Sequence, residues 1–412
     1  MSARIIGRAG MRLAALLGVL LLAAPASAAP DDFERIERGR YLATVGDCVA
    51  CHRGPNGPYG GGTALETPFG NIYPPNITPD RVTGIGAWSA DDFWNAMHNG
   101  VRPDGAHLYP GFPYPNFTKV TRADSDAIFA FLQTLPPVNA PRRPTELPFP
   151  LNIRFAMFGW NMLFFSPGEF VPDPGKPAEW NRGAYLVEGL GHCGACHTAK
   201  NFLGADSGTS LGGGMVQGWT APALTSDSRT GLGAWSVEEV MEFLRTGRNV
   251  RSAASGIMAE AVEHSTHAFT ESDLRAIAVY LKSLPGDGAD APAPVAASDP
   301  TMRQGAAIYA DGCQACHRGD GQGVEGIFSR LAGNQIAQQA EPAGLIRMVL
   351  AGSRAAATDA APTAPAMPPF GWRLSDEEVA AVTTFVRNSW GNAGPAVTAA
   401  DVAAQRGRLA GR

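Results

Sequence analysis

Three copies of the pattern Cys-x-x-Cys-His constrain this chain more than any other feature of its sequence. They use all six cysteines of the 412 residues, in the stretches CVACH, CGACH and CQACH. Two thiols in this pattern can add across the vinyl groups on one edge of a haem, and the adjacent histidine can bind the iron. The pattern therefore predicts c-type haem attachment at three places. The residues are Cys48, Cys51 and His52; Cys193, Cys196 and His197; and Cys313, Cys316 and His317.

Other uses of paired cysteines fit this spacing less well. A structural zinc site takes four ligands from paired motifs at suitable spacing, whereas these three pairs are isolated from one another. A thioredoxin-like pair would lie in a βαβ pattern, which this sequence lacks. We therefore expect three covalently bound haem c groups, with His52, His197 and His317 as the proximal iron ligands.

The N-terminal stretch 1–28 has the composition of a secretory signal peptide. Arg4, Arg8 and Arg12 precede the apolar run LAALLGVLLLAAP, and small residues offer a cleavage site after Ala28. The apolar run is short for a bilayer span, so a retained anchor is the less favoured interpretation. We expect an exported protein on the periplasmic side of the cytoplasmic membrane, where any membrane association is peripheral. Attachment of c-type haem outside the cytoplasm agrees with export.

Composition and charge exclude several classes of protein. Hydrophobic residues make up 45% of the chain and charged residues 17%, so the chain can bury cores and is not disordered. Loss of the three N-terminal arginines changes the formal net charge from −5 to −8. An acidic mature chain does not favour nucleic-acid binding. Outside the N-terminal stretch, no segment is apolar for long enough to cross a membrane.

Each motif lies in the same frame of expected elements. A short glycine-containing helix precedes it, and an amphipathic helix with Thr or Ser three residues before an acid closes the frame. Gly39, Gly183 and Gly305 would let the first helix cross the last at close range. This is the helical cytochrome c arrangement three times over. We therefore predict an all-α fold of three tandem cytochrome c-like domains joined by proline-rich linkers.

Proline- and alanine-rich stretches set the expected domain boundaries. The aromatic stretch 154–165 is either an interface patch for a partner or lipid, or a strap packed between domains, and we favour the strap slightly. We divide the chain into a signal peptide (1–28), a first domain (31–140), a linker strap (141–175), a second domain (176–285), a second linker (286–298), a third domain (299–392) and a tail (393–412).

A sixth iron ligand can be sought by aligning the chain with itself. The stretch PNITPDRVTGIGAWS matches PALTSDSRTGLGAWS, and this alignment places Met258 opposite Phe112. Met367, in APAMPPFGW, occupies the corresponding place before the last helix. We expect Met258 and Met367 to be sixth ligands, which raise the haem potential. Phe112 cannot bind iron, so the first haem should differ from the other two.

Three interpretations of the first haem remain open. The iron is five-coordinate or weakly ligated in the first, His107 binds it in the second, and Met97 or His98 binds it in the third. We rank them in that order, because His107 lies on the same loop as Phe112 whereas Met97 and His98 fall within an expected helix.

Other residues near the motifs have secondary roles in this interpretation. Pro75 and Pro222 align, and their carbonyls could accept the second ring N–H of a proximal histidine, although a role in a turn is about equally favoured. His192, His264 and His267 have no required ligand role, and we expect them at the surface.

The stretches EWNRGAYLVEGLGHCGACHT, HLYPGFPYPNFTKV and PAMPPFGWRLSDEEV together resemble the three-haem cytochrome c subunit of membrane-associated bacterial dehydrogenases, over nearly the whole mature chain. That family serves quinoprotein alcohol dehydrogenases, FAD-dependent gluconate, sorbitol and fructose dehydrogenases, and some molybdenum hydroxylases. The resemblance implies an electron-transfer subunit with no catalytic residue of its own. Its partner would be a catalytic dehydrogenase subunit of the quinoprotein, FAD or molybdenum type, and its acceptor ubiquinone or a downstream oxidase. Many members have Met where Phe112 stands here.

Two other functions stay open on the sequence alone. The first haem could form a catalytic, peroxidase-like site, with His107 as an acid or base beside the position that Phe112 leaves without a ligand. The chain could also be a free-standing periplasmic electron shuttle without a dehydrogenase partner.

Overall fold

The computed structural model describes residues 29–288 and 290–410, so the expected signal peptide lies outside the described residues. The described part is mostly helical, and it also contains three two-stranded antiparallel sheets, which the all-α prediction did not include. Two of the hairpins (65–72 and 214–221) lie between a motif and the next helix, whereas the third (353–367) lies after the helix that follows its motif. Among the described helices, none combines the length and the apolar character needed to cross a membrane.

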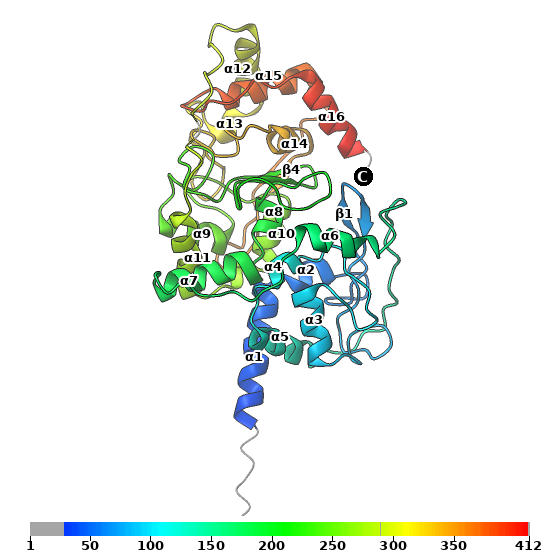
Figure 1. Cartoon of the computed structure of the whole chain (residues 1–412). Coiled ribbons are helices and arrows are strands. Elements are labelled where there is room, and N and C mark those ends of the chain that lie inside the picture. The colour runs from blue at the N-terminus through cyan, green and yellow to red at the C-terminus, as the bar shows by residue number, and fades with distance from the viewer. Residues whose placement is uncertain (1–28, 289, 411–412) are drawn as a thin grey trace, which may run out of the picture.

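The elements follow one another in a similar order after each motif (Figure 1). We call the three stretches segment 1 (31–140), segment 2 (176–285) and segment 3 (299–392). Segment 1 contains α1 (Ala29–Val45, which begins just before it), α2 (Cys48–His52), β1 (Leu65–Thr67), β2 (Gly70–Ile72), α3 (Ala90–Asn99), α4 (Tyr114–Phe117) and α5 (Arg122–Leu132). Segment 2 contains α7 (Ala178–Tyr185), the π-helical turn η1 (Leu186–Leu190), α8 (Gly194–His197), β3 (Gly214–Val216), β4 (Trp219–Ala221), α9 (Val237–Thr246), α10 (Ile257–His264), the 3₁₀ turn η2 (Thr266–Ala268) and α11 (Glu271–Ser283). Segment 3 contains α12 (Pro300–Gly312), α13 (Gln314–His317), α14 (Ala343–Ala351), β5 (Ser353–Arg354), β6 (Ala366–Met367) and α15 (Asp376–Arg387).

The first and last helices of each segment cross at a glycine. α1 packs against α5, α7 against α11 and α12 against α15. A Cβ atom added to Gly39, Gly183 or Gly305 would lie 1.8, 2.0 or 2.2 Å from a backbone carbonyl oxygen of the partner helix. Only hydrogen fits in that space, so the expectation of a close crossing at these three glycines is confirmed.

The last helices begin where their N-cap residues predict. The side chains of Thr121, Thr270 and Ser375 each accept a hydrogen bond from the backbone N–H three residues later. In α15 the side chain of Glu378 also bonds back to the Ser375 backbone and completes a capping box. The acids at the same position of α5 and α11 are aspartates, and their carboxylates are used elsewhere.

Segments 1 and 2 share one hydrophobic core. The largest buried cluster joins side chains of α1 and α5 to side chains of α7, η1 and α11. Segment 3 has its own clusters, around α14 and α15. A small cluster of Ala254, Ala259, Val262 and Ala356 joins segments 2 and 3. Segments 1 and 2 therefore form one body with a common core. Segment 3 is attached to this body through segment 2.

The stretch expected to be a tail contains a further helix, α16 (Ala399–Ala410). Val402 is fully buried against segment 3, and Arg406 pairs with Asp376 at 2.8 Å. Arg406 also donates to the carbonyls of Gly371 and Leu374. The prediction of a tail missed this helix. Its apolar side chains are few, and only their packing against segment 3 identifies it.

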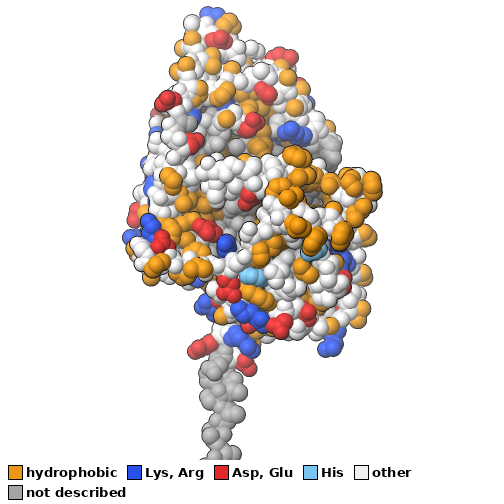
Figure 2. All heavy atoms as spheres, in the orientation of Figure 1, with side chains coloured by type: hydrophobic (Ala, Val, Ile, Leu, Met, Phe, Trp, Pro, Cys, Tyr) orange, Lys and Arg blue, Asp and Glu red, His pale blue; other side chains and the backbone are white. Residues whose placement is uncertain are grey.

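The linker strap contains α6 (Ala156–Phe164), which contacts both segments of the body. The Trp160 indole N–H donates to the Leu203 carbonyl in segment 2 at 3.0 Å, and Arg154 donates to the His107 carbonyl in segment 1 at 3.0 Å. The outer side of α6 and its flanks is apolar and exposed, and in Figure 2 hydrophobic side chains gather over this region. We call this surface the α6 patch: Phe149, Ile153, Phe155, Phe158, Met162, Leu163 and Phe164.

We predict that Gly183→Ala destabilises the protein, whereas Gly159→Ala does not. The new methyl group at position 183 would overlap the Ala276 carbonyl and force α7 and α11 apart, at a cost of about 1–3 kcal/mol or more. Gly159 lies in α6 with nothing within 4 Å of an added Cβ, so its replacement should stabilise that helix by up to ~1 kcal/mol. Thermal unfolding of both variants measures this, and equal melting temperatures would contradict the close crossing.

Candidate functional site

The three motif histidines are held in the same way. Nδ1 of His52 lies 2.7 Å from the Pro75 carbonyl oxygen, and Nδ1 of His197 lies 2.7 Å from that of Pro222. Since a carbonyl can only accept, Nδ1 carries the proton and Nε2 keeps its lone pair for a metal. The expected bonds to Pro75 and Pro222 are confirmed.

Segment 3 makes the same bond with a residue that the sequence did not indicate. His317 Nδ1 lies 2.9 Å from the carbonyl oxygen of Ser329. Pro75 and Pro222 could be found because segments 1 and 2 align with each other. Segment 3 has no proline at this place, and a backbone acceptor leaves no mark on residue type.

Burial shifts the pKa of the three motif histidines and of two thiols toward the uncharged form. It lowers the pKa of His52, His197 and His317, and the carbonyl hydrogen bonds only partly oppose this. Burial also raises the pKa of Cys48 and Cys51 to about 12. Neutral imidazoles with a free Nε2, next to buried neutral thiols, suit covalent haem attachment better than a site of thiolate ligands.

In segment 3 the predicted haem residues line one cavity. This cavity has a volume of about 540 Å³, and Cys313, Cys316, His317 and Met367 all contribute to its wall. Most of the remaining wall is apolar, with Leu345, Met348, Val349, Val382 and Val386 among its side chains. Two thiols, an imidazole and a thioether around one apolar cavity are the donor set of a His/Met c-type haem. The residues present therefore fit the group.

Segment 2 supplies part of the wall of that cavity. Its residues 248–250 and 252–255 line the cavity, and Ser255 pairs with Ala355 through a β-bridge. Met258 follows three residues later, in the first turn of α10. It is half-buried and packs beside the small cluster that joins segments 2 and 3.

In segment 1, Phe112 occupies the place where a methionine was sought. It is half-buried against the shared core, with its ring centroid 5.2 Å from that of Phe117. The Phe117 ring in turn lies 5.3 Å from the His192 ring of segment 2. His192 is therefore at the contact between the two segments, and the expectation that it lies at the surface was wrong. Only the packing of the two segments reveals this position.

The three alternative ligands for the first haem have packing partners. Nδ1 of His107 lies 3.4 Å from the Asn161 amide nitrogen of α6, and its ring contacts Phe158. Met97 is 5% exposed in the core. His98 stacks on Trp94 with ring centroids 4.4 Å apart. Each side chain therefore has a structural role without an iron ligand bond.

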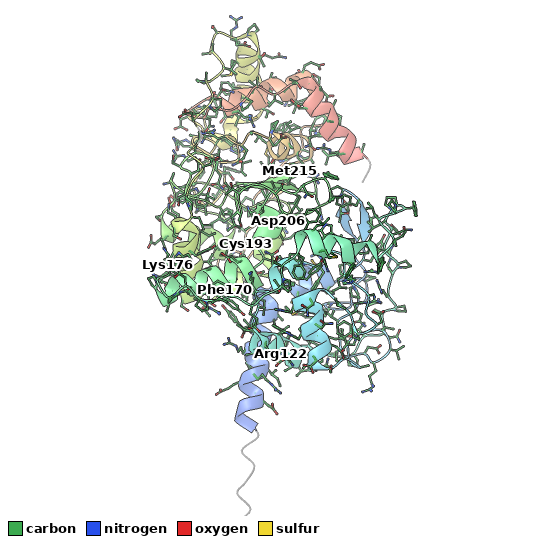
Figure 3. All side chains as sticks on the ribbon, in the orientation of Figure 1. Arg122, Phe170, Lys176, Cys193, Asp206 and Met215 are labelled. Carbon is green, nitrogen blue, oxygen red and sulfur yellow. The ribbon has the colours of Figure 1, made fainter. Side chains whose placement is uncertain are left out.

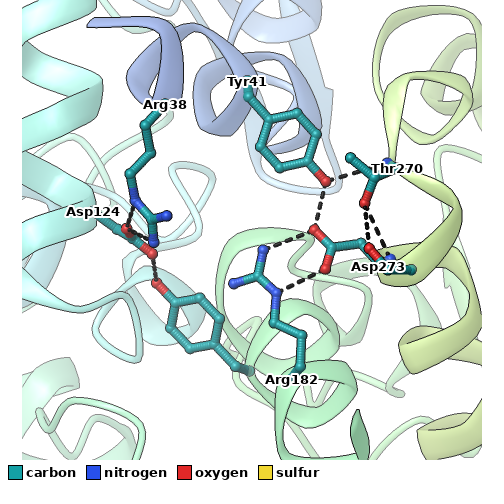
Figure 4. A network of polar contacts seen from close by, with 8 residues as sticks. Arg38, Tyr41, Asp124, Arg182, Thr270 and Asp273 are labelled. Atoms are coloured by element: carbon teal, nitrogen blue, oxygen red, sulfur yellow. Dashed lines mark hydrogen bonds and ion pairs between the residues drawn. The ribbon is translucent and has the colours of Figure 1, made fainter. Parts of the chain in front are cut away.

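Two reciprocal sets of hydrogen bonds hold segment 1 against segment 2 (Figure 4). Asp273 of α11 accepts two hydrogen bonds from Arg182 of its own segment, at 2.8 and 2.7 Å. It also accepts one from Tyr41 of α1, across the contact, at 2.5 Å. Burial alone would raise the pKa of Asp273, but the bonds from Arg182 and Tyr41 outweigh burial and hold that pKa below its usual value.

The second set of hydrogen bonds has the same form, with the roles of segments 1 and 2 reversed. Asp124 of α5 accepts from Arg38 of its own segment at 2.7 Å and from Tyr185 of α7 at 2.6 Å. In both α1 and α7 the tyrosine follows the arginine by three residues, so both side chains leave one face of the helix. The two first helices, which lead directly into the first two motifs, are thus held in one fixed relation.

Comparisons with known proteins agree with the motifs. A family model described as Cytochrome c matches residues 36–136 and 302–390. The gluconate 2-dehydrogenase cytochrome c subunit of Pantoea cypripedii is 41% identical over 96% of this chain and 94% of its own length. The cytochrome c subunit of alcohol dehydrogenase (quinone) of Gluconacetobacter polyoxogenes is 41% identical over 90% of this chain and 84% of its own. The fructose dehydrogenase cytochrome subunit of Gluconobacter japonicus is 36% identical over 93% and 85%.

We predict that Arg182→Gln destabilises the protein at neutral pH and that the effect fades in acid. The depressed pKa of Asp273 means that the ion pair contributes fully above the ordinary carboxyl pKa of about 3.9 and is lost as pH falls through the folded-state value. The expected loss at neutral pH is about 2 kcal/mol.

The control is Arg275→Gln, which removes exposed ion pairs with Glu179 and Glu238. We expect it to change stability by under ~1 kcal/mol. Thermal unfolding between neutral and strongly acidic pH measures both variants. If the loss of stability in Arg182→Gln stayed constant across this pH range, the assigned role of Asp273 would be contradicted.

Proposed function

Because the chain belongs to the family of cytochrome c subunits of bacterial dehydrogenases, we propose that it carries electrons from a catalytic dehydrogenase subunit toward the respiratory chain. The observation that carries this proposal is the cavity of segment 3, whose wall includes Cys313, Cys316, His317 and Met367. A cavity with a mostly apolar wall and this donor set suits a group that exchanges electrons.

We propose that segments 1, 2 and 3 are three cytochrome c domains, each with one covalently bound haem c. The thioether bonds form at Cys48 and Cys51, Cys193 and Cys196, and Cys313 and Cys316. When bound, each haem supplies a one-electron carrier. The protein holds His52, His197 and His317 in the tautomer that leaves Nε2 free, and their carbonyl partners support this in all three segments.

The sixth ligands in this proposal are Met258 and Met367. The position of Met367 on the cavity wall supports its assignment, and Met258 occupies the aligned place in segment 2. Segment 1 has Phe112 there, while His107, Met97 and His98 pack against other side chains. We therefore propose a first haem that is five-coordinate or weakly ligated. The contacts of His107 with α6 do not favour a peroxidase-like role.

The relatives support the kind of partner that we propose. Cytochrome subunits of gluconate, alcohol (quinone) and fructose dehydrogenases support a partner that oxidises an alcohol or sugar with its own flavin or quinoprotein cofactor, and a molybdenum partner remains an alternative. We propose export to the periplasmic side of the cytoplasmic membrane, peripheral association there, and ubiquinone or a downstream oxidase as acceptor.

The α6 patch is the surface that we propose for assembly. Met162 and Leu163 are each 74% exposed and Phe155 is 78% exposed, side by side on one short helix and its flank. Contiguous apolar surface of this kind marks a protein or membrane contact. Since Trp160 of α6 bonds to segment 2 and Asn161 of α6 accepts a hydrogen bond from Tyr114 of segment 1, a partner bound there would be fixed relative to the first two motifs.

The test of the proposed function is purification of the exported chain from its native membrane. We expect intact mass to show three added haems and a dehydrogenase subunit to co-purify, whose substrate reduces the haems. Fewer than three haems would contradict the three-domain proposal. A chain that purifies alone from gently solubilised membranes would favour the free-standing shuttle.

A pair of variants tests the assembly surface in the same preparation. Met162→Asp with Leu163→Asp should release the partner or the membrane while leaving the haem content unchanged. Val82→Asp is the matched control, since Val82 is exposed in a loop of segment 1 away from α6. Binding of the isolated chain to vesicles, compared with its binding to the dehydrogenase subunit, identifies which contact the patch makes.

We predict that Met258→Ala and Met367→Ala each lower one of three midpoint potentials, because loss of a thioether ligand removes the effect that raises the potential. Met215→Ala is the control, since Met215 lies exposed on the β3–β4 hairpin, apart from the motif residue Cys193 in Figure 3. Spectroelectrochemical titration measures the potentials, and electron paramagnetic resonance measures the ligation. Unchanged spectra in either variant would remove that methionine from the ligand set.

A further inference from the structure

A second cavity lies where segments 2 and 3 meet. Its volume is about 310 Å³, and its wall includes the three arginines Arg229, Arg251 and Arg330. Arg229 and Arg251 come from loops of segment 2 and Arg330 comes from the loop of segment 3 that follows its motif. Three guanidinium groups around one small cavity repel one another unless an anion lies among them.

Two of these arginines have buried donors without an acceptor. Nε of Arg229 and Nε of Arg330 are both inaccessible to solvent and have no hydrogen-bond partner. Arg229 uses its Nη1 atom to donate to the carbonyls of Gln338 in segment 3 and of Ala393 just after it, at 3.0 and 3.2 Å. Leaving a buried donor unpaired costs about 1–3 kcal/mol. Two of the three arginines on the cavity wall therefore keep guanidinium donors that the protein itself does not use.

The charges around the cavity also lack compensation. Glu239 pairs with Arg251 at 2.8 Å, and Asp227 accepts hydrogen bonds from the backbone and side chain of its own turn. Lys282 donates to the carbonyls of Leu232 and Gly233 and does not line the cavity. Of the three arginines on the cavity wall, only Arg251 therefore pairs with a carboxylate among the described residues.

Segment 1 shows that the turn does not need an arginine. Asp80 organises its turn with the same bonds to Thr83 that Asp227 makes to Thr230. The residue equivalent to Arg229 in segment 1 is Val82, which is 87% exposed. The guanidinium of Arg229 therefore has no part in forming the turn, and its contacts are with segment 3.

Arg330 connects this cavity with the haem cavity of segment 3, because its side chain lines both. It also follows Ser329, whose carbonyl holds His317. We propose that Arg229, Arg251 and Arg330 form an oxyanion site that binds a carboxylate or a phosphate. The carboxylate source is a propionate of the haem in segment 3, which rests on the proposed function, and the other source is free phosphate.

The test variant is Arg330→Gln, because no hydrogen bond or ion pair of the described residues involves that guanidinium and the fold does not depend on it. Arg330→Lys keeps the charge and serves as the conservative rescue. Arg245→Gln removes an arginine of segment 2 from an exposed pair with Glu271 and serves as the control. Haem content by intact mass, midpoint potentials and melting temperature are measured for each, without and with inorganic phosphate.

A haem propionate and free phosphate predict different results in these measurements. A haem propionate predicts that Arg330→Gln lowers one midpoint potential without added phosphate, because a cation near the iron favours the reduced state. The shift should be about tenfold in the ratio of reduced to oxidised haem, which is ~59 mV for one electron, and Arg330→Lys should restore most of it. Free phosphate predicts instead that added phosphate raises the melting temperature of the wild type and of Arg330→Lys but not of Arg330→Gln.

Two outcomes separate this inference from the proposed function. If the wild type carries three haems and Arg330→Gln behaves like Arg245→Gln in every measurement, the oxyanion site is overturned while the function stands. If the wild type lacks the haem of segment 3, the proposed function fails, and the phosphate measurement alone then decides whether the arginines bind an anion.

Discussion

The crossing of the first helix over the last determines where each motif lies. At Gly39, Gly183 and Gly305 the helices approach so closely that a methyl group would overlap a carbonyl oxygen of the partner helix. Each motif follows its first helix within a few residues, so the crossing fixes the start of the attachment site. The N-cap residue then determines where along the chain the last helix begins. The loop between them then brings a carbonyl to the motif histidine in every segment.

The acid at the start of the last helix has a different partner in the third segment from its partner in the first two. The N-cap residue of every last helix is followed three residues later by an acid. Glu378 bonds back to its own N-cap, whereas Asp124 and Asp273 bind the tyrosine of the neighbouring segment. The aspartates therefore join segments 1 and 2 around a common core. In segment 3 the acid bonds within its own helix. Segment 3 therefore contacts segment 2 through other residues.

Local rules account for the parts of the structure that the sequence predicted. The motifs, the close-crossing glycines, the N-caps and the carbonyls of Pro75 and Pro222 each depend on residues near one another in the chain or on internal alignment. The parts that were missed depend on partners far away in sequence. His192 is half-buried only because Phe117 of another segment covers it, and α16 is recognised only from the surface on which it packs. Ser329 acts through its backbone, so its side chain gives no signal.

The contact between segments 2 and 3 connects the two methionine-bearing stretches. Ser255 pairs with Ala355, and Met258 lies three residues beyond Ser255. Ala355 follows β5, whose partner strand β6 carries Met367. A short run of backbone pairing therefore links the candidate ligand of segment 2 to that of segment 3, and residues of the same segment 2 loop line the cavity that contains Met367. Because closely packed protein interiors transmit strain, replacement of Met258 should alter the cavity of segment 3. No comparable backbone link among the described residues joins Phe112 to either methionine, so the first site is free to differ from the other two.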